Sequence, residues 1–368
     1  MRVLLVNDRA PGPGSGVEMH VARLARALEE AGDTVEVFGG EVQHDGIAKV
    51  LDVWDPAARR KVAERARRFQ PDVVHHHNVV RELSVSVLGV PASAAQVLTV
   101  HDYRLVQAHE GSEGSQGSSI SYPMLWAKSA KGVLDRVVVR RRVDVVIAVS
   151  QALGKRLDAA RFPRVTTVEN FADAERCWTP PDGHDLLFAG RLSEEKGLDV
   201  LIEAFAEVVA SGAPGCLRLA GTGPVEASLR SLAERVAPDR VVFEGLVSEE
   251  RVRELMRASR AVCAVSTRLT EGAPLVAIEA LLVGRPVVAT DSPAFRNLLE
   301  RRERPLGLIV APGDRAALVT ALARVLTDDA YVRATGRLAY DVAAETHTPA
   351  HAVAELHRVY ERAIEVHR

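Results

Sequence analysis

Two cations share one short loop in the second half of the chain. The apolar stretch Leu186–Ala189 runs into Gly190–Gly197, which contains Arg191 and Lys196, and a helical pattern begins directly afterwards. This order predicts a loop at the carboxyl end of a parallel strand, where open α/β sheets bind their ligands. A planar guanidinium and a mobile ammonium suit a diphosphate. Without any metal ion, they can also neutralise the charge of a diphosphate that leaves as the product forms. The alternative is surface pairing with the nearby acids Glu194, Glu195 and Asp199.

Two glutamates lie near a second predicted loop-to-helix junction. The stretch 261–265 leads through Glu271, Gly272 and Pro274 into an apolar helical run that contains Glu279. Free N–H groups at a helix start bind anions. A carboxylate inside an apolar helix is costly unless it is hydrogen-bonded, and ribose hydroxyls would bond Glu279. In the alternative interpretation Glu279 pairs with Arg285, and Glu271 is an ordinary loop acid.

Two β-branched runs in the first half of the chain end in histidines. One ends in His75-His76-His77, and the other ends in His101-Asp102. Neighbouring strand residues point to opposite faces, and no carboxylate or cysteine completes a zinc set, so we predict no metal site. His77 and Asn78 are expected to line the acceptor side at a strand end, or else to have structural roles. His101 is expected to contact substrate, and the alternative is a local hydrogen bond.

A glycine-rich stretch, residues 12–16, follows the predicted strand Val3–Val6. It resembles a dinucleotide fingerprint, but Val17 replaces the third glycine and Asp8–Pro11 intervene after the strand, which disfavours an NAD enzyme. We expect instead a loop at a helix N-terminus that lets the backbone approach the sugar and phosphate of a ligand.

Strand and helix patterns alternate along all 368 residues, which is typical of parallel sheets. The prolines and glycine of 179–183 suit an interdomain connection, so we predict two doubly wound Rossmann-like domains, residues 1–170 and 171–349. An amphipathic helix is expected within residues 350–368. The predicted strands are 3–6, 34–38, 73–75, 97–101, 145–149, 165–168, 186–189, 217–220, 241–243, 261–265, 287–289 and 308–310.

Composition excludes several classes of protein. The chain is 47% hydrophobic and 26% charged with a net charge of −2, which argues against disorder and against a nucleic-acid binder. Three widely spaced cysteines fit a reducing compartment, and neither a signal peptide nor a membrane span is evident, so a soluble cytoplasmic protein is expected. Basic windows at 59–68 and 128–142 are interpreted as solvated helix faces, with an anionic acceptor or a peripheral membrane contact as the alternative. Residues 111–121 are expected to form a mobile loop, or a flap over substrate.

Taken together, these motifs resemble the retaining glycosyltransferases of family 4, the glycogen-synthase-like group with the GT-B fold. The resemblance covers nearly the whole chain, and it implies two domains facing across a cleft, with the last helix bracing the first domain. The matching segments are the glycine-rich loop, Gly190–Gly197, Glu271 with Glu279, Pro71–His75, Thr99–Asp102, Ala148–Ser150, Gly284–Thr290 and Ala311–Asp314. Two features depart from the family pattern: residues 291–296 replace its Gly-Gly-x-Pro-Glu segment, and the cysteine often found near His-Asp-Tyr is absent.

The resemblance also implies roles for individual residues. Arg191 and Lys196 would hold the donor diphosphate, Glu271 would touch the donor sugar, and Glu279 would bind the ribose. His101 would face the reacting sugar, with Asp102 and Tyr103 as further acceptor-side candidates. The donor site would be completed by Gly14, Ser15, Gly16, Gly190, Gly272, Ala273, Pro274 and Leu275.

The expected activity is transfer of a sugar from a UDP- or GDP-sugar to the hydroxyl of a glycan, a lipid-linked acceptor or a small molecule. Retention of configuration is implied with no assigned nucleophile, and no cofactor or metal is required. Two alternatives are a sugar phosphorylase or sugar-phosphate-forming enzyme on the same fold, and a nucleotide-binding module that has lost catalysis.

Overall fold

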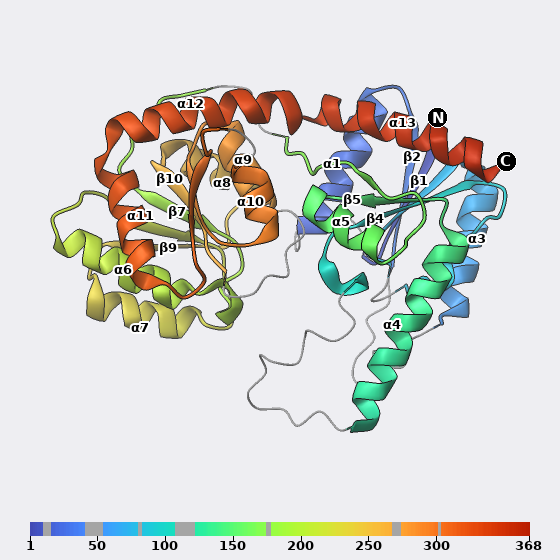
Figure 1. The fold of residues 1–368 in the computed structure, drawn as a ribbon, viewed down its shortest axis with the longest axis horizontal. Helices are drawn as coiled ribbons and strands as arrows, with labels where there is room; N and C mark the ends of the chain where they lie inside the picture. The colour runs from blue at the N-terminus through green and yellow to red at the C-terminus, as the bar shows by residue number, and fades with distance from the viewer. Residues whose placement is uncertain are drawn as a thin grey trace. The chain divides into compact units, whose positions relative to one another are not determined.

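The computed structural model describes residues 1–9, 16–40, 54–79, 83–106, 122–173, 178–266, 274–300 and 303–368, without the side chains of 122–130. The chain divides into two compact units (Figure 1). Unit 1 consists of Met1–Asn170 and the terminal segment Pro349–Arg368, and unit 2 consists of the described residues from Phe171 to Thr348. Each unit contains one six-stranded sheet, and every strand pair is parallel. The predicted pair of doubly wound domains is confirmed.

The sheet of unit 1 has the order β2-β1-β3-β4-β5-β6. The direction in which strands are added reverses between β1 and β3, and ligands of open α/β sheets bind beside such a switch point. Asn7 pairs in register with His77, and His77 with Thr99, so the carboxyl ends of β1, β3 and β4 are aligned. The strands are β1 (Arg2–Asn7), β2 (Thr34–Gly39), β3 (Val73–His77), β4 (Ala95–Val100), β5 (Val145–Ala148) and β6 (Thr166–Thr167).

Helices cover both faces of this sheet. Helix α3 (Pro56–Phe69) shares a core with Leu4, Val6 and Leu98. On the other face α13 (Pro349–His367) packs against β3, β4 and α1 (Gly16–Glu30), as Figure 1 shows. The expected amphipathic helix is present, and its apolar face is buried at Val353, Leu356, Val359, Tyr360 and Ala363. The remaining helical segments of this unit are η1 (Val85–Val87), η2 (Tyr103–Leu105), α4 (Tyr122–Arg142) and α5 (Gln151–Ala159).

Unit 2 repeats the design with the strand order β12-β11-β10-β7-β8-β9, and its switch point lies between β7 and β10. Its strands are β7 (Leu186–Ala189), β8 (Leu217–Ala220), β9 (Val241–Gly245), β10 (Ala261–Ala264), β11 (Val287–Thr290) and β12 (Gly307–Val310). The helices are η3 (Glu194–Lys196), α6 (Leu198–Ala210), α7 (Glu226–Val236), α8 (Glu249–Ala258), α9 (Leu275–Leu282), α10 (Pro293–Leu299), α11 (Arg315–Thr327) and α12 (Asp329–Thr346). Among the described residues, no helix combines the length and apolar character that crossing a membrane requires.

Local signals in the sequence placed these elements well. The predicted strands 186–189 and 217–220 match β7 and β8 residue for residue. A serine followed by two acidic residues is a helix-start signal, and Ser248, before Glu249 and Glu250, is the N-cap of α8: its side chain accepts a hydrogen bond from the Arg251 N–H at 3.2 Å. The stretch expected to be a connection is fixed to unit 2, where the buried Arg285 guanidinium donates to the Thr179 carbonyl at 2.8 Å.

Candidate functional site

The switch point of unit 2 brings two predicted loops together. β7 continues into the loop that contains Arg191 and Lys196, and the neighbouring β10 continues into Ser266. The Ser266 hydroxyl donates to the Glu195 carbonyl at 2.9 Å, and the Ser266 N–H donates to the Thr290 hydroxyl of β11 at 2.9 Å. Three adjacent strand ends are therefore joined by hydrogen bonds at one edge of the sheet.

The two cations of the first loop differ in setting. Arg191 is exposed and makes no ion pair with an acidic side chain in the part of the chain that the structure describes. Lys196 is half-buried at the end of η3, just before Gly197, whose φ of 58° is left-handed. Burial alone would raise the pKa of Glu195. The polar surroundings, first the Ser193 side chain and then the backbone, together with the charges of Lys196 and Arg191, lower it below its usual value. Both cations thus act on this acid, as surface pairing would predict.

A glycine turn that the sequence analysis missed supports this loop. Gly221 and Gly223 follow β8, and the N–H of Leu192 donates to the Thr222 carbonyl at 3.0 Å. A Cβ at Gly221 would lie 1.9 Å from the Gly190 oxygen, and one at Gly223 would lie 2.0 Å from the Leu192 oxygen. Only glycine fits this close approach of two backbones. The signal was available, since two glycines directly follow a predicted strand.

The second predicted loop is described only from Pro274 onward, so Glu271, Gly272 and Ala273 lie outside the described residues. Pro274 occupies the N-cap of α9, and Leu275 begins the helix, so its N–H lacks an intrahelical partner. Glu279 is half-buried on this helix. The alternative partner considered for it, Arg285, donates to main-chain carbonyls, including that of Val283 at 2.8 Å. Burial lowers the pKa of this guanidinium to about 10.

Three histidines lie close together at the switch point of unit 1. His77 at the end of β3 contacts His101 just after β4, with His77 Nδ1 3.0 Å from His101 Nε2. The ring of His20, from α1, lies edge-on to His101 with 5.3 Å between ring centroids. Ligand nitrogens of these three histidines all lie within 4.8 Å of one another. The sequence analysis weighed only the consecutive histidines as a metal set, and it missed the contribution of His20.

These imidazoles are held neutral. Burial lowers the pKa of His20 from 6.5 to about 4, with Arg23 adding to the effect. Burial, followed by the neighbouring histidines, lowers the pKa of His77 and His101 well below 6.5. A neutral imidazole carries one donor and one acceptor nitrogen, so this edge suits hydroxyl groups better than anions.

The other residues predicted for the site in unit 1 lie in different settings. Asn78 follows β3 in a left-handed conformation with a φ of 48°. The carboxylate of Asp102 accepts from the Arg104 N–H at 2.9 Å and caps η2, and Tyr103 is buried. Gly16 is the first residue of α1, whereas Gly14, Ser15 and the segment 111–121 lie outside the described residues.

The basic window on α3 is partly occupied by structural contacts. Arg65 pairs with Glu36 at 2.8 Å, and Arg59 donates to the Ser86 carbonyl at 2.5 Å. Lys61, Arg65 and Arg68 also line a hollow of about 210 Å³. The interpretation as a helix face with salt bridges therefore holds for part of this window.

Comparison with known proteins identifies the chain. Its residues 14–176 match the family model "Glycosyltransferase Family 4", and residues 183–328 match "Glycosyl transferases group 1". The sucrose-phosphate synthase of Thermosynechococcus elongatus has the same fold, with a TM-score of 0.78 at 20% identity over 98% of this chain and 99% of that one. Two parallel doubly wound sheets and these matches define a glycosyltransferase with the GT-B fold. The chain belongs to the group 1 glycosyltransferases of family 4.

Two curated relatives extend over most of the chain. The phosphatidyl-myo-inositol mannosyltransferase of Mycolicibacterium smegmatis is 29% identical over 352 residues, covering 89% of this chain and 86% of that protein. The 2-deoxystreptamine glucosyltransferase of Streptomyces kanamyceticus is 26% identical over 343 residues, covering 87% and 84%. A solved structure of Anabaena HepE in complex with UDP and glucose has a TM-score of 0.71 at 20% identity, covering 98% of this chain and 99% of that one.

Proposed function

We propose that this glycosyltransferase moves a sugar from a nucleotide-diphosphate sugar to an acceptor hydroxyl with retention of anomeric configuration. The observation that carries the proposal is the switch point of unit 2. There the loop of Arg191 and Lys196, the glycine turn after β8 and the strand end at Ser266 meet at one edge of the sheet. Solved complexes of HepE with UDP and with UDP-glucose support a nucleotide-sugar donor.

The donor would be held by charge and by backbone dipoles. Arg191 and Lys196 bind the diphosphate and stabilise the negative charge that develops as the glycosidic bond breaks. The start of α9 supplies N–H groups to a phosphate, and Glu279 accepts hydrogen bonds from the ribose hydroxyls. Glu271, outside the described residues, is proposed for the donor sugar. Because two cations neutralise the leaving diphosphate, the reaction is proposed to need no metal.

Unit 1 would bind the acceptor and complete the reaction site. His101 presents a buried, neutral imidazole for a hydrogen bond with a sugar hydroxyl. We assign no residue as a nucleophile. The acceptor is proposed to be a glycan, a lipid-linked sugar or a small molecule, since relatives are named for a phosphoinositide and for an aminocyclitol acceptor.

A ligand panel followed by product analysis tests this function. UDP, GDP, ADP, dTDP and inorganic phosphate are compared for their effect on the melting temperature, because a ligand that binds the native state raises it. We expect one nucleoside diphosphate to stabilise the enzyme, and the corresponding sugar donor to give a product whose anomeric configuration, read by NMR, matches the donor. Stabilisation by inorganic phosphate alone would favour a phosphorylase, and an inverted product would contradict retention.

A further inference from the structure

A run of buried polar rings connects the terminal helix α13 with His101. The Tyr360 hydroxyl of α13 lies 2.7 Å from Nδ1 of His75, and Nε2 of His75 lies 2.6 Å from the Thr99 hydroxyl. The ring of His75 packs against that of His77 with centroids 4.2 Å apart, and His77 is hydrogen-bonded to His101. All five side chains are at least nine-tenths buried.

The hydrogen bonds assign protons along this run. Among the described residues the Tyr360 hydroxyl has Nδ1 of His75 as its one hydrogen-bond partner, so we assign its O–H as the donor in this contact. The proton of His75 must then be on Nε2, where it is donated to the Thr99 hydroxyl. Tyr360 and Thr99 therefore fix both the tautomer and the ring plane of His75.

The protons of His77 and His101 can be assigned by the same reasoning. Nε2 of His77 is buried without a hydrogen-bond partner in the described part of the chain. A buried N–H without a partner is rarer than a buried acceptor without one, so the proton of His77 is best placed on Nδ1. His77 then donates to Nε2 of His101, which leaves His101 as the Nδ1–H tautomer. In this state His101 offers a hydrogen-bond donor from Nδ1.

We propose that Tyr360, His75 and His77 are positioning residues that hold His101 in one orientation and one tautomer for sugar transfer. The proposal rests on the proposed function, in which His101 faces the reacting sugar. It makes α13, about 260 residues beyond His101 in the sequence, part of the machinery that orders the site. Tyr360 acts only through the rings between it and His101, and it touches no reacting atom.

A metal site is the competing use of the same cluster. Nitrogens of His20, His77 and His101 lie within 4.8 Å of one another, which suits a transition metal in number and type of ligand. The contact between His77 and His101, at 3.0 Å, is however a hydrogen bond that occupies a lone pair a cation would need. The observed geometry therefore favours the hydrogen-bonded network.

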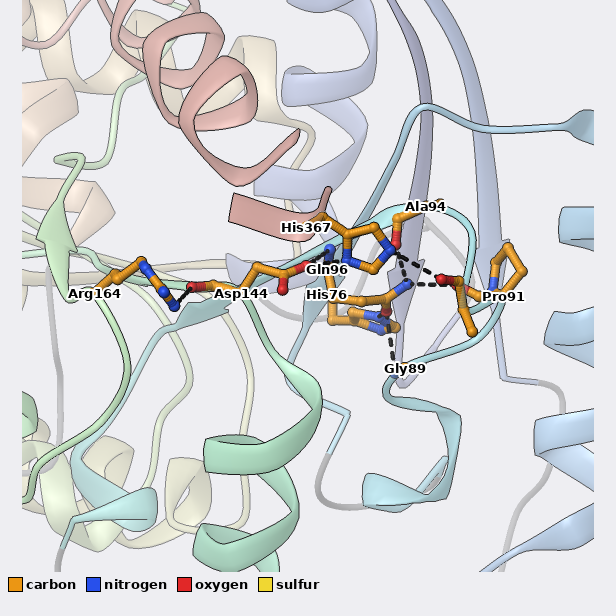
Figure 2. A network of polar contacts seen from close by, with 9 residues as sticks. His76, Gly89, Pro91, Ala94, Gln96, Asp144, Arg164 and His367 are labelled. Carbon is orange, nitrogen blue, oxygen red and sulfur yellow. Dashed lines mark hydrogen bonds and ion pairs between the residues drawn. The ribbon is translucent and has the colours of Figure 1, made fainter. Parts of the chain in front are cut away.

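The opposite face of β3 offers a matched control. His76 is as buried as its neighbours, but its Nε2 contacts Gln96 Oε1 at 2.9 Å (Figure 2). This oxygen also accepts from the Gly89 N–H at 3.1 Å, so it keeps a partner when His76 is replaced. The variant His76→Leu thus removes a buried histidine of the same strand without touching the network.

Three variants test the network against that control. Tyr360→Phe deletes one hydroxyl and should lower kcat about tenfold, the scale of one hydrogen bond, with the donor KM changed less than about twofold. His77→Leu should lower kcat about 100-fold, because the buried Nε2 of His101 loses its donor. His77→Asn should restore about tenfold of that loss, since its amide nitrogen can replace Nδ1. The control His76→Leu should leave kcat unchanged at a comparable loss of melting temperature.

Nitrogen-15 NMR of histidine-labelled protein reports the tautomer of His101 independently of activity. We expect the Nδ1–H form in the wild type and a mixture of tautomers in Tyr360→Phe and His77→Leu. A single unchanged tautomer in both variants, or a kcat equal to that of His76→Leu, would overturn the network. A rise in melting temperature with equimolar Zn²⁺ that His20→Ala abolishes would overturn it in favour of a metal site. If the wild-type protein transfers no sugar, the proposed function is overturned. The NMR result then decides on the network by itself.

Discussion

The two switch points have the same topology but opposite electrostatics. In unit 1 the strand ends hold buried imidazoles that bond one another and stay neutral. In unit 2 they hold glycine turns and an exposed guanidinium. An edge of neutral, hydrogen-bonded imidazoles suits hydroxyl groups, and an edge with an exposed positive charge suits a diphosphate. We infer that sheet topology provides a position for a site, while the side chains at the strand ends decide which ligand it takes.

The largest expected effect is that acid lowers the stability of unit 1 more than that of unit 2. In the unfolded chain histidine binds a proton near pH 6.5, whereas burial lowers the pKa of His20 and His76 to about 4 in the folded state. Between these values the unfolded state carries more protons, so the free energy of unfolding falls as the pH falls. Each such histidine removes about 1.4 kcal/mol per pH unit, and the contribution of these histidines is constant above about pH 7.

Hydrogen exchange at pH 7.5, 6.5 and 5.5 measures this effect strand by strand. We expect β3 and β4 to lose protection as the pH falls while β7 and β10 keep theirs. Equal loss in both units would contradict the assignment of the acid sensitivity to the buried histidines.

Removing either cation of the loop after β7 should reduce sugar transfer without unfolding unit 2. Arg191→Ala and Lys196→Ala are each expected to reduce transfer at least about 100-fold, the scale of one transition-state charge partner. Arg253→Ala is the matched control, because Arg253 pairs with Glu249 at 4.0 Å on the surface of α8. Steady-state kinetics give the result, and unchanged turnover in folded Arg191 and Lys196 variants would reject the diphosphate assignment.

Replacing Gly221 tests whether the backbone of the glycine turn contributes to nucleotide binding in unit 2. Gly221→Ala places a Cβ against the Gly190 oxygen at a φ of 138°, so the loop of Arg191 must shift. We expect a loss of about 2 kcal/mol in stability and weaker nucleotide binding. Gly212→Ala has a similarly positive φ of 96° but open space around it, so it should affect stability alone. Calorimetry with the stabilising nucleotide separates the two, and equal affinities would remove the glycine turn from the donor site.

The smallest expected effect concerns Glu279. Glu279→Ala should weaken nucleotide binding about tenfold through loss of the hydrogen bonds that we propose between Glu279 and the ribose. Titration with the nucleoside diphosphate and with its 2′,3′-dideoxy analogue provides the measurement, since the variant should bind the two alike. A lower melting temperature with unchanged affinity would make Glu279 a structural residue.

The sequence by itself determined the alternation of strands and helices, the cap at Ser248, and the position of Arg191 and Lys196 directly after a strand. These features are local, because burial periodicity and capping involve residues a few positions apart. Only the tertiary structure decided that the loop after β7 meets the strand end at Ser266, that Gly221 presses against Gly190, and that Tyr360 bonds His75. Such contacts join residues that are tens to hundreds of positions apart, and they depend on strand order and helix placement, which no local pattern encodes.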